Sequence, residues 1–171
     1  MSISLTRRAL LVGAAMHPLA ACAAAEGQEI PSAANEARYA RSPWRALTQA
    51  QWQARLSPAA FAVLRHEDTE RAGTSPLNEE HRHGTFVCAG CALPLFRSEW
   101  KFNSGTGWPS FSRVIETNIG TKEDFLLFQP RTEYHCAQCL GHQGHVFPDG
   151  PRPSGLRYCN NGVALRFVPD A

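Results

Sequence analysis

One cysteine near the end of the chain lies among side chains that can activate a thiol. Its neighbours in sequence are two histidines, an aspartate, an arginine and an asparagine: His142, His145, Asp149, Arg157 and Asn161 around Cys159. Only the thiolate is a good nucleophile, so a thiol with bases and a cation close by is what cysteine chemistry requires. A free cysteine can equally be a small buried residue on a strand. How the other cysteines are used decides between these interpretations.

Four further cysteines form two pairs with the same spacing, Cys88-Ala-Gly-Cys91 and Cys136-Ala-Gln-Cys139. Both thiolates of such a turn can point at one tetrahedral ion, and Gly90 would ease the tight backbone of the first turn. Each pair follows a predicted strand, so one ion would join two hairpins that are distant in sequence. Four thiolates prefer Zn²⁺, with iron as the alternative, and a closed four-cysteine shell leaves no open position for catalysis. The spacing predicts one structural zinc ion.

Two alternatives stay open for these pairs. Exported proteins often form disulfides, so the four cysteines could be bridged within or between the pairs. A redox CxxC would instead begin a helix in a βαβ unit, a pattern that is missing here. If all four bind metal, Cys22 and Cys159 remain, and lipidation of Cys22 would leave Cys159 as the only free thiol. A free thiol kept in an exported protein suggests that it is used.

Residues 1–22 predict an export signal, with a positive start followed by an apolar run too short to span a membrane. Arg7-Arg8 before Ala-Leu-Leu resembles a twin-arginine signal, and Leu19-Ala-Ala-Cys22 resembles the lipobox of bacterial lipoproteins. Both can apply to one chain, and an uncleaved, disordered N-terminus is the alternative. We expect an exported protein of the bacterial periplasm, whose membrane contact would be a lipid on Cys22.

The mature body is close to electrically neutral. Of the 17 Lys and Arg residues two lie in the leader, so 15 basic residues face 15 acidic ones. Nucleic-acid binding usually leaves a basic footprint, so that function is disfavoured. The 43% hydrophobic and 19% charged content is typical of a globular domain rather than of general disorder. No run of 18 or more apolar residues is present to span a membrane.

The elements of the body follow from turn and capping signals. Residues 23–41 are rich in Ala, Glu and Ser without an apolar period, which predicts a flexible linker before one domain over residues 42–171. Two Ser-Pro pairs predict a helix from Pro43 through Leu56 and a second helix from Pro58 to near Glu67.

Short β-type runs separated by Gly, Pro, Asn and Asp follow position 84. The predicted strands cover residues 85–88, 113–117, 125–129, 133–136, 144–147, 156–159 and 163–168. Helices that precede strands, without a long crossover helix, favour a mainly-β or α+β domain with antiparallel sheets.

Several blocks of the body occur together in one order: Gly105-Thr-Gly-Trp108-Pro-Ser-Phe111, the paired CxxC, Gly144-His145-Val-Phe-Pro-Asp149-Gly-Pro, and Gly155-Leu-Arg157-Tyr-Cys159-Asn-Asn161. They resemble the methionine sulfoxide reductase B family, which reduces the R epimer of methionine sulfoxide in proteins. The likeness runs from about Trp44 to Val168. It implies two antiparallel β-sheets with short N-terminal helices and a zinc ion away from the active centre.

By this resemblance, Cys159 is the nucleophile and Trp108 is the ring on which the S-methyl group of the substrate packs. The residues implied around the sulfoxide oxygen are His142, His145 and Asp149, and those implied beside the nucleophile are Arg157 and Asn161. The Cys159 thiolate would attack sulfur while His145, held by Asp149, supplies a proton to the oxygen, and Arg157 would favour the thiolate. Cys159 would be left as a sulfenic acid.

The chain departs from the family pattern at two places. Many members have a second, resolving cysteine where this chain has Thr106, so no intramolecular disulfide can form unless Cys22 reaches back. An external thiol or a thioredoxin-like partner would then reduce the sulfenic acid. Asn160, Gly162 and Val163 stand where the family often has Ile, Ser and Ala, and we expect Asn160 to have the largest effect on packing or substrate fit.

The leading hypothesis is an exported, zinc-stabilised peptide-methionine (R)-S-oxide reductase, acting as a monomer on oxidised proteins or peptides. The alternative is a non-catalytic zinc-knuckle binding module, whose function would survive Cys159→Ser but not the unfolding caused by Cys88→Ser. A cysteine hydrolase using Cys159, His145 and Asn161 is a third hypothesis, but no oxyanion element is recognisable in the sequence.

Overall fold

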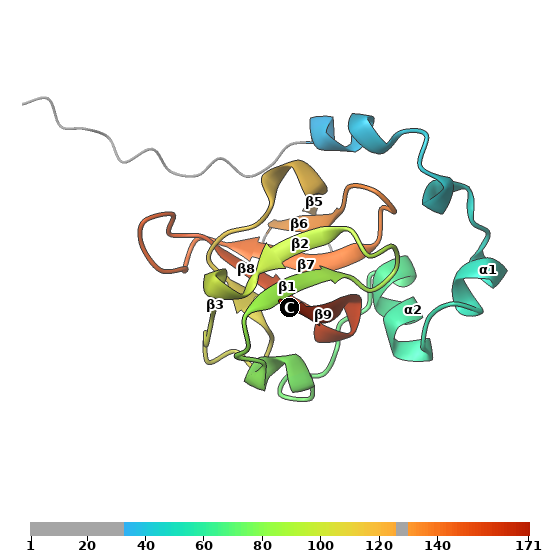
Figure 1. Ribbon diagram of the computed structural model, residues 1–171. Coiled ribbons are helices and arrows are strands. Elements are labelled where there is room, and N and C mark those ends of the chain that lie inside the picture. Colours follow the sequence, from blue (N-terminus) through green and yellow to red (C-terminus); the bar gives the residue numbers. More distant parts are fainter. Residues whose placement is uncertain (1–32, 126–129) are drawn as a thin grey trace, which may run out of the picture.

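The computed structural model describes residues 33–125 and 130–171, which form two antiparallel sheets (Figure 1). The smaller sheet has the strand order β2-β1-β9, with β1 at Gly84–Cys88, β2 at Pro94–Arg97 and β9 at Leu165–Pro169. The larger sheet has the order β3-β4-β8-β7-β6-β5. Its strands are β3 (Lys101–Phe102), β4 (Ser110–Phe111), β5 (Ile119–Asp124), β6 (Arg131–Cys136), β7 (His142–Phe147) and β8 (Arg157–Asn160). The predicted fold class is confirmed.

Short helices precede and connect the strands. They are η1 (Ala33–Tyr39), η2 (Pro43–Ala46), α1 (Gln49–Gln53), α2 (Pro58–His66), η3 (Pro76–Glu79), η4 (Ser98–Trp100), η5 (Glu116–Asn118) and η6 (Gly162–Ala164), where η marks a 3-10 helix. The prediction of α2 is confirmed: the Ser57 hydroxyl accepts from the Ala60 amide, and Glu67 ends the helix in a left-handed conformation.

The single helix predicted from Pro43 through Leu56 is wrong. It is divided into η2 and α1 because Leu47 is extended, with φ −70° and ψ 135°. Thr48 then starts a new helix through a capping box, in which its hydroxyl accepts from the Gln51 amide while the Gln51 side chain accepts from the Thr48 amide.

The strand predictions at residues 85–88, 133–136, 144–147 and 156–159 are confirmed to within two residues. The strand predicted at 163–168 begins only at Leu165, because η6 occupies the preceding positions. The strand predicted at 113–117 is wrong: Val114 is buried there without ladder pairing, and η5 follows. Residues 126–129 of another predicted strand lie outside the described residues, and β5 ends just before them.

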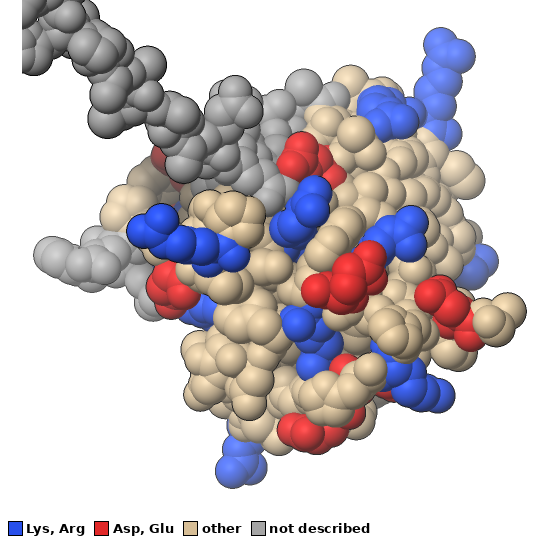
Figure 2. All heavy atoms as spheres, turned by 60° about the vertical axis from the view of Figure 1, so that its left-hand side comes forward, with Lys and Arg blue, Asp and Glu red and all other residues tan. Residues whose placement is uncertain are grey.

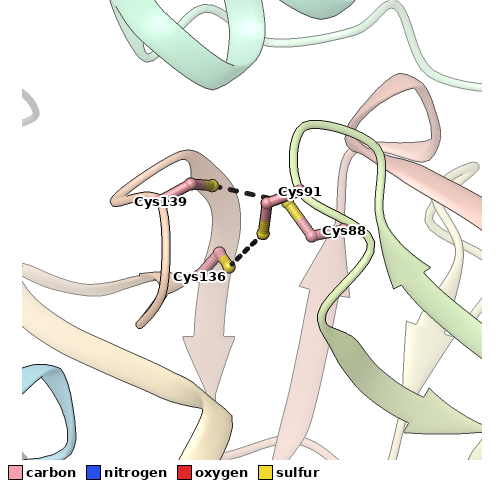
Figure 3. Close-up of side chains that lie close together, drawn as sticks. All are labelled: Cys88, Cys91, Cys136 and Cys139. Atoms are coloured by element: carbon pink, nitrogen blue, oxygen red, sulfur yellow. Dashed lines mark hydrogen bonds between the residues drawn. The ribbon is translucent and has the colours of Figure 1, made fainter. Parts of the chain in front are cut away.

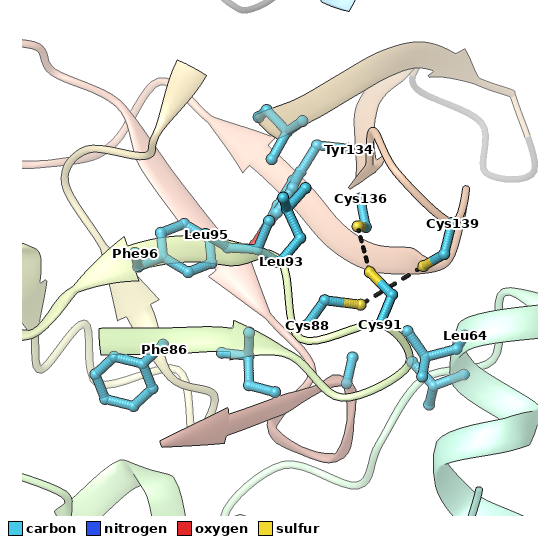
Figure 4. Packing of buried hydrophobic residues seen from close by; sticks show 14 of the residues in the cluster. Leu64, Phe86, Cys88, Cys91, Leu93, Leu95, Phe96, Tyr134, Cys136 and Cys139 are labelled. Atoms are coloured by element: carbon cyan, nitrogen blue, oxygen red, sulfur yellow. Dashed lines mark hydrogen bonds between the residues drawn. The ribbon is translucent and has the colours of Figure 1, made fainter. Parts of the chain in front are cut away.

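Aromatic side chains from both sheets form the core between them (Figure 4). Phe96 of β2 stacks on Phe111 of β4 with ring centroids 4.0 Å apart, and its edge meets Tyr134 of β6 at 6.2 Å. Phe86 of β1 meets Phe111 edge-on at 5.0 Å. The buried cysteines lie at one end of this cluster, as Figure 4 shows, so they are continuous with the core.

The predicted export signal at residues 1–22 and the first part of the predicted linker lie outside the described residues. The last part of that linker is not free, because η1 packs on the larger sheet. The Asn35 side chain donates to the Ile119 carbonyl at 3.1 Å, and the Tyr39 hydroxyl donates to the Asn118 side chain at 2.9 Å. Glu36 pairs with His135 at 2.9 Å.

Charges of both signs are mixed on the surface. On the face drawn in Figure 2, Lys and Arg side chains alternate with Asp and Glu over uncharged surface. Arg82 pairs with Glu80 at 2.6 Å, and Lys122 pairs with Glu67. Among the described residues, no helix has both the length and the apolar character needed to cross a membrane.

Candidate active site and metal centre

One row of directly paired residues crosses five strands of the larger sheet and contains the predicted nucleophile. From β5 to β4 its members are Lys122, Glu133, His145, Cys159 and Ser110. Paired residues project from the same face of a sheet, and neighbours along a strand project from the other face. Tyr158, next to Cys159, accordingly points into the core. Strand register therefore places Cys159 beside His145.

A cavity of about 130 Å³ opens at this row. Trp108, His145, Cys159 and Asn161 line it, together with Phe147 and Arg131. Cys159 is half-buried, so its sulfur can meet a small group that enters the cavity. The Trp108 indole donates to the Glu70 carbonyl at 2.8 Å, which fixes the ring at the cavity wall. Four of the predicted site residues are brought together here.

His145 is held by Asp124, a residue that the sequence did not indicate. Nε2 of His145 lies 2.8 Å from Oδ2 of Asp124, and Arg131 donates to the same oxygen at 2.5 Å. Because a carboxylate only accepts, Nε2 carries the proton and Nδ1 keeps its lone pair. Burial lowers the pKa of His145 although Asp124 acts in the opposite direction, so the imidazole is neutral near pH 7.

The predicted contact between His145 and Asp149 is wrong. Asp149 is 60% exposed and accepts two hydrogen bonds from Arg157, at 2.8 and 2.9 Å. It follows β7 in a turn, and the planar guanidinium of β8 is the partner that fits its carboxylate. The Arg157 guanidinium also lies 4.4 Å from the centre of the Phe147 ring. Asp149 therefore positions Arg157 rather than the imidazole.

Arg157 acts on the nucleophile through its charge. Burial raises the pKa of the Cys159 thiol, whereas the Arg157 cation and the hydroxyls of Thr106 and Ser110 act in the opposite direction. The resting pair is thus a thiol at Cys159 and a neutral imidazole at His145. Both groups become charged only when a proton moves from the Cys159 thiol to the His145 imidazole.

His142 lies behind His145 rather than at the cavity wall. It is only 3% exposed, its Nδ1 is 3.1 Å from Oε1 of Glu133, and its ring centre is 5.5 Å from that of His145. Burial would raise the pKa of Glu133, but its interactions with His135, His142 and Lys122 hold it well below its usual value. Glu133 is therefore an ionised carboxylate next to His142.

The two asparagines after the nucleophile bind the backbone around the site. Asn161 accepts from the Glu70 amide at 2.9 Å and donates to the Gln143 carbonyl at 3.0 Å. Asn160 is fully buried, where it accepts from the Tyr134 hydroxyl at 2.7 Å and donates to the Asn161 carbonyl at 2.7 Å. The side-chain oxygen and nitrogen of Asn160 thus both have hydrogen-bond partners inside the core.

The four paired cysteines converge from the ends of β1 and β6 (Figure 3). Their sulfur atoms all lie within 4.8 Å of one another; Cys88 and Cys139 are 3.6 Å apart, and Cys91 and Cys136 are 3.4 Å apart. A disulfide needs about 2.05 Å, so the alternative of bridged cysteines is excluded. Four buried thiol donors around one point fit a tetrahedral metal ion.

Local backbone geometry forms both cysteine turns in the same way. The left-handed residues are Ala92, with φ 62°, and Leu140, with φ 59°, rather than Gly90 as expected. Their amides donate back to the carbonyls of Cys88 and Cys136, each at 2.9 Å.

Neighbouring side chains hold the quartet from outside. The Gln143 amide group donates to the Cys88 sulfur at 3.5 Å, and Arg65 donates to the Cys139 carbonyl at 2.9 Å. Arg45 donates to the Ala137 carbonyl at 2.7 Å. The turn that begins at Cys136 is thus fixed by two arginines from the N-terminal helices, and none of the four cysteines lines the cavity at Cys159.

Comparison with known proteins identifies the family. Residues 56–169 match the SelR domain. The chain is 50% identical over 123 residues to the peptide methionine sulfoxide reductase MsrB of Bradyrhizobium diazoefficiens, covering 71% of this chain and 88% of that protein. It is 48% identical over 123 residues to the protein of the same name from Thiobacillus denitrificans, covering 71% and 93%. With the chloroplastic peptide methionine sulfoxide reductase B1 of Arabidopsis thaliana it shares 42% over 138 residues, covering 80% and 68%. The chain belongs to the methionine sulfoxide reductase B family of enzymes, oxidoreductases that act on sulfur.

Proposed function

We propose that this protein reduces the R epimer of methionine sulfoxide in peptides and proteins, with Cys159 as the nucleophile. Membership of the family gives methionine sulfoxide reduction as the reaction. The residue-level proposal rests on one observation: Cys159, His145 and Trp108 line the same small cavity. A thiol, an imidazole and an indole are the groups needed to attack sulfur, move a proton and seat a methyl group.

The oxygen transfer needs one proton, which the Cys159 thiol itself supplies. Nδ1 of His145 accepts this proton and then gives it to the sulfoxide oxygen as the thiolate attacks the substrate sulfur. In the adduct the hydroxyl group moves from the substrate sulfur to the cysteine sulfur, and the S–O bond and the newly formed S–S bond both break. Methionine leaves and Cys159 is left as a sulfenic acid. The cysteine sulfur is oxidised by two electrons and the substrate sulfur is reduced by two. Thiol plus sulfoxide therefore gives sulfenic acid plus thioether.

The walls of the cavity favour a methyl sulfoxide. The Trp108 ring and the Phe147 ring supply apolar surface for the methyl group and the side-chain carbons. The Arg157 cation stabilises the thiolate as it forms, and Asp124 stabilises the imidazolium. Each charge that the proton transfer creates therefore has a nearby group of opposite charge.

An external thiol returns Cys159 to its reduced form. The other cysteines among the described residues belong to the quartet, and Thr106 occupies the position where many members of the family have a resolving cysteine. A thiol or thioredoxin-like reductant attacks the sulfenic acid to give a mixed disulfide and water. A second thiol group then releases Cys159.

Three further points belong to the proposal. One Zn²⁺ ion binds the cysteine quartet and serves structure, since four protein thiolates fill its coordination shell. The leader directs export to the bacterial periplasm, with Cys22 as a lipid attachment site; this rests on the sequence of residues 1–22 alone. The protein works as a monomer.

Turnover of each epimer of a methionine sulfoxide peptide, with dithiothreitol as reductant, tests the reaction. The R epimer is expected to be reduced, the S epimer to remain, and Cys159→Ser to abolish turnover while thermal unfolding and metal content stay unchanged. Cys88→Ser is the matched control, since it removes a sulfur from the quartet and destabilises the fold. An active Cys159→Ser variant would refute the proposal, as would failure of the wild type to reduce the R epimer.

A further inference from the structure

Three hydroxyl groups form a short hydrogen-bonded chain beside Cys159, with Ser104 in the middle. The Ser104 hydroxyl lies 2.8 Å from that of Thr106 and 2.8 Å from that of Ser110. Ser110 is fully buried and is the direct partner of Cys159 in the pairing of β4 with β8. Its oxygen also lies 3.1 Å from the Trp108 carbonyl. The hydroxyls of Thr106 and Ser110 both act to lower the pKa of the Cys159 thiol.

The loop before β4 is shaped to bring these groups together. Gly105 and Gly107 adopt φ +73° and +89°, so the chain turns back twice within four residues and Thr106 faces Ser104. A side chain at Gly107 would place its Cβ 2.9 Å from the Gly73 amide nitrogen, so the second turn is packed against a neighbouring loop. The backbone of this loop thus sets the positions from which the three hydroxyl side chains meet.

We propose that the Ser104–Thr106–Ser110 hydroxyl cluster is part of the catalytic machinery, in which Thr106 and Ser110 donate to the Cys159 sulfur as it becomes a thiolate. Ser104 does not touch the sulfur and is a positioning residue for the other two. This inference rests on the proposed role of Cys159 as the nucleophile. Hydrogen bonds from neutral donors to an anion are stronger than those to a thiol, so the cluster favours the reactive form.

Three linked hydroxyls stabilise the Cys159 thiolate better than one hydroxyl would, because their protons can reorient together. Each hydroxyl carries one proton that rotates to suit its surroundings. Beside the thiol, the Ser110 proton can go to the Trp108 carbonyl and the Ser104 and Thr106 protons can stay within the cluster. Beside the thiolate, the Thr106 and Ser110 protons turn to sulfur while the Ser104 proton fills an acceptor position on one of them. A donor that itself accepts a hydrogen bond is polarised and donates more strongly.

Other titratable and charged groups around Cys159 set its baseline reactivity. Arg157 lies on the same strand, His145 lies on β7, and the carboxylate of Glu70 binds the Gly162 amide at 2.6 Å in the adjoining loop. Behind His145 lie three more: Asp124 of β5, and Arg131 and Glu133 of β6. Substitution of a hydroxyl changes none of these charges, so a difference in thiol reactivity reports the cluster alone.

The test measures alkylation of Cys159 by iodoacetamide in the full-length protein, read by mass spectrometry of the peptide that contains it. At a fixed pH below the thiol pKa, the rate follows the thiolate fraction. Thr106→Val and Ser110→Ala are each expected to slow it by about threefold to tenfold, and Ser104→Ala by about twofold. Ser112→Ala is the control, because its hydroxyl donates to the Trp100 carbonyl at 3.2 Å instead; its rate is expected to match the wild type.

Thermal unfolding of each variant separates an effect on the thiol from an effect on the fold. Should Ser110→Ala prove unstable, the half-buried Thr106→Val decides the question alone. Wild-type alkylation rates in a folded Thr106→Val variant overturn the proposal, and so does an equal slowing in Ser112→Ala. If hydroxyl loss slows alkylation but the wild type fails to reduce the R epimer, the proposed function fails while the effect of the cluster on the thiol stands.

Discussion

At the residue scale, the identity of the carboxylate that faces His145 determines how the imidazole works. Asp124 binds Nε2, which leaves Nδ1 available as the base of the proposed mechanism, whereas Asp149 binds Arg157. The two aspartates therefore have separable effects: one on the proton carrier, the other on the cation that stabilises the thiolate.

Asp124→Asn is expected to lower kcat/KM by about tenfold to a hundredfold. The base must be neutral, so activity falls as pH drops through the pKa of His145, which burial already places below its usual value. Asp124 opposes that shift, so its removal lowers the pKa further and moves the acid limb of the pH profile to lower pH. A kcat/KM profile measures both effects. Asp149→Asn is the matched control and should leave the acid limb in place; a shift in both variants would contradict this assignment.

Asp124 also shows where prediction of the site from sequence stops. Cys159 and His145 were found because they stand in short blocks with recognisable neighbours, as does Trp108. Asp124 meets His145 through its pairing with Arg131 across β5 and β6, and no pattern near position 124 fixes that register. Contacts that depend on how one strand aligns with another can be identified only once the fold is known.

At the element scale, the cysteine quartet brings together two hairpins at one end of the core. β1 leads into one cysteine turn and β6 into the other, so the quartet links the smaller sheet to the larger one. The spacing of the cysteines was sufficient to predict this link. Strands β3 and β4, each of two residues, were missed because they are too short to show an alternating pattern.

Removal of the metal by a strong chelator is expected to destabilise the fold by several kcal/mol, lowering the midpoint of thermal unfolding by more than about 10 °C. Four uncompensated thiols would then crowd a buried site between the hairpins. Differential scanning calorimetry before and after chelation, with readdition of Zn²⁺, measures the change. An unaltered midpoint after complete metal removal would show that the core alone holds the hairpins together.

The aromatic stack between the sheets gives a second prediction at this scale. Phe96→Ala is expected to cost about 3–5 kcal/mol in the free energy of unfolding, because both stacked rings are fully buried. Denaturant unfolding provides the value. Phe125→Ala, at an exposed ring, is the control and should change stability little.

At the scale of the whole molecule, the N-terminal segment that precedes the SelR match fastens the metal centre from outside. Arg45 donates to the carbonyls of Glu36 and Ala137, at 2.9 and 2.7 Å, and so ties η1 to the second cysteine turn. Figure 1 shows this segment passing around one side of the sheets before it reaches α2. The sequence predicted a flexible linker up to residue 41, which includes η1, since scattered polar residues do not reveal which surface they bind.

Arg45→Ala is therefore expected to speed transfer of the metal to a chromogenic chelator by about threefold to tenfold, through loss of two charge-assisted hydrogen bonds. Turnover of methionine sulfoxide should remain near the wild-type value, because Arg45 is remote from the row that contains Cys159. Arg41→Ala, at an exposed position in the same segment, is the comparison. Equal release rates in all three proteins would rule out this fastening role.

The narrow cavity at Cys159 has a consequence for which damaged proteins can be repaired. A space of about 130 Å³ accepts the tip of one side chain but no folded backbone. An oxidised residue packed inside its own protein must first swing outward, which happens where that protein has already lost local order. Under the proposed function, oxidised residues in locally disordered segments of a protein are therefore expected to be reduced before those that stay packed in an intact fold.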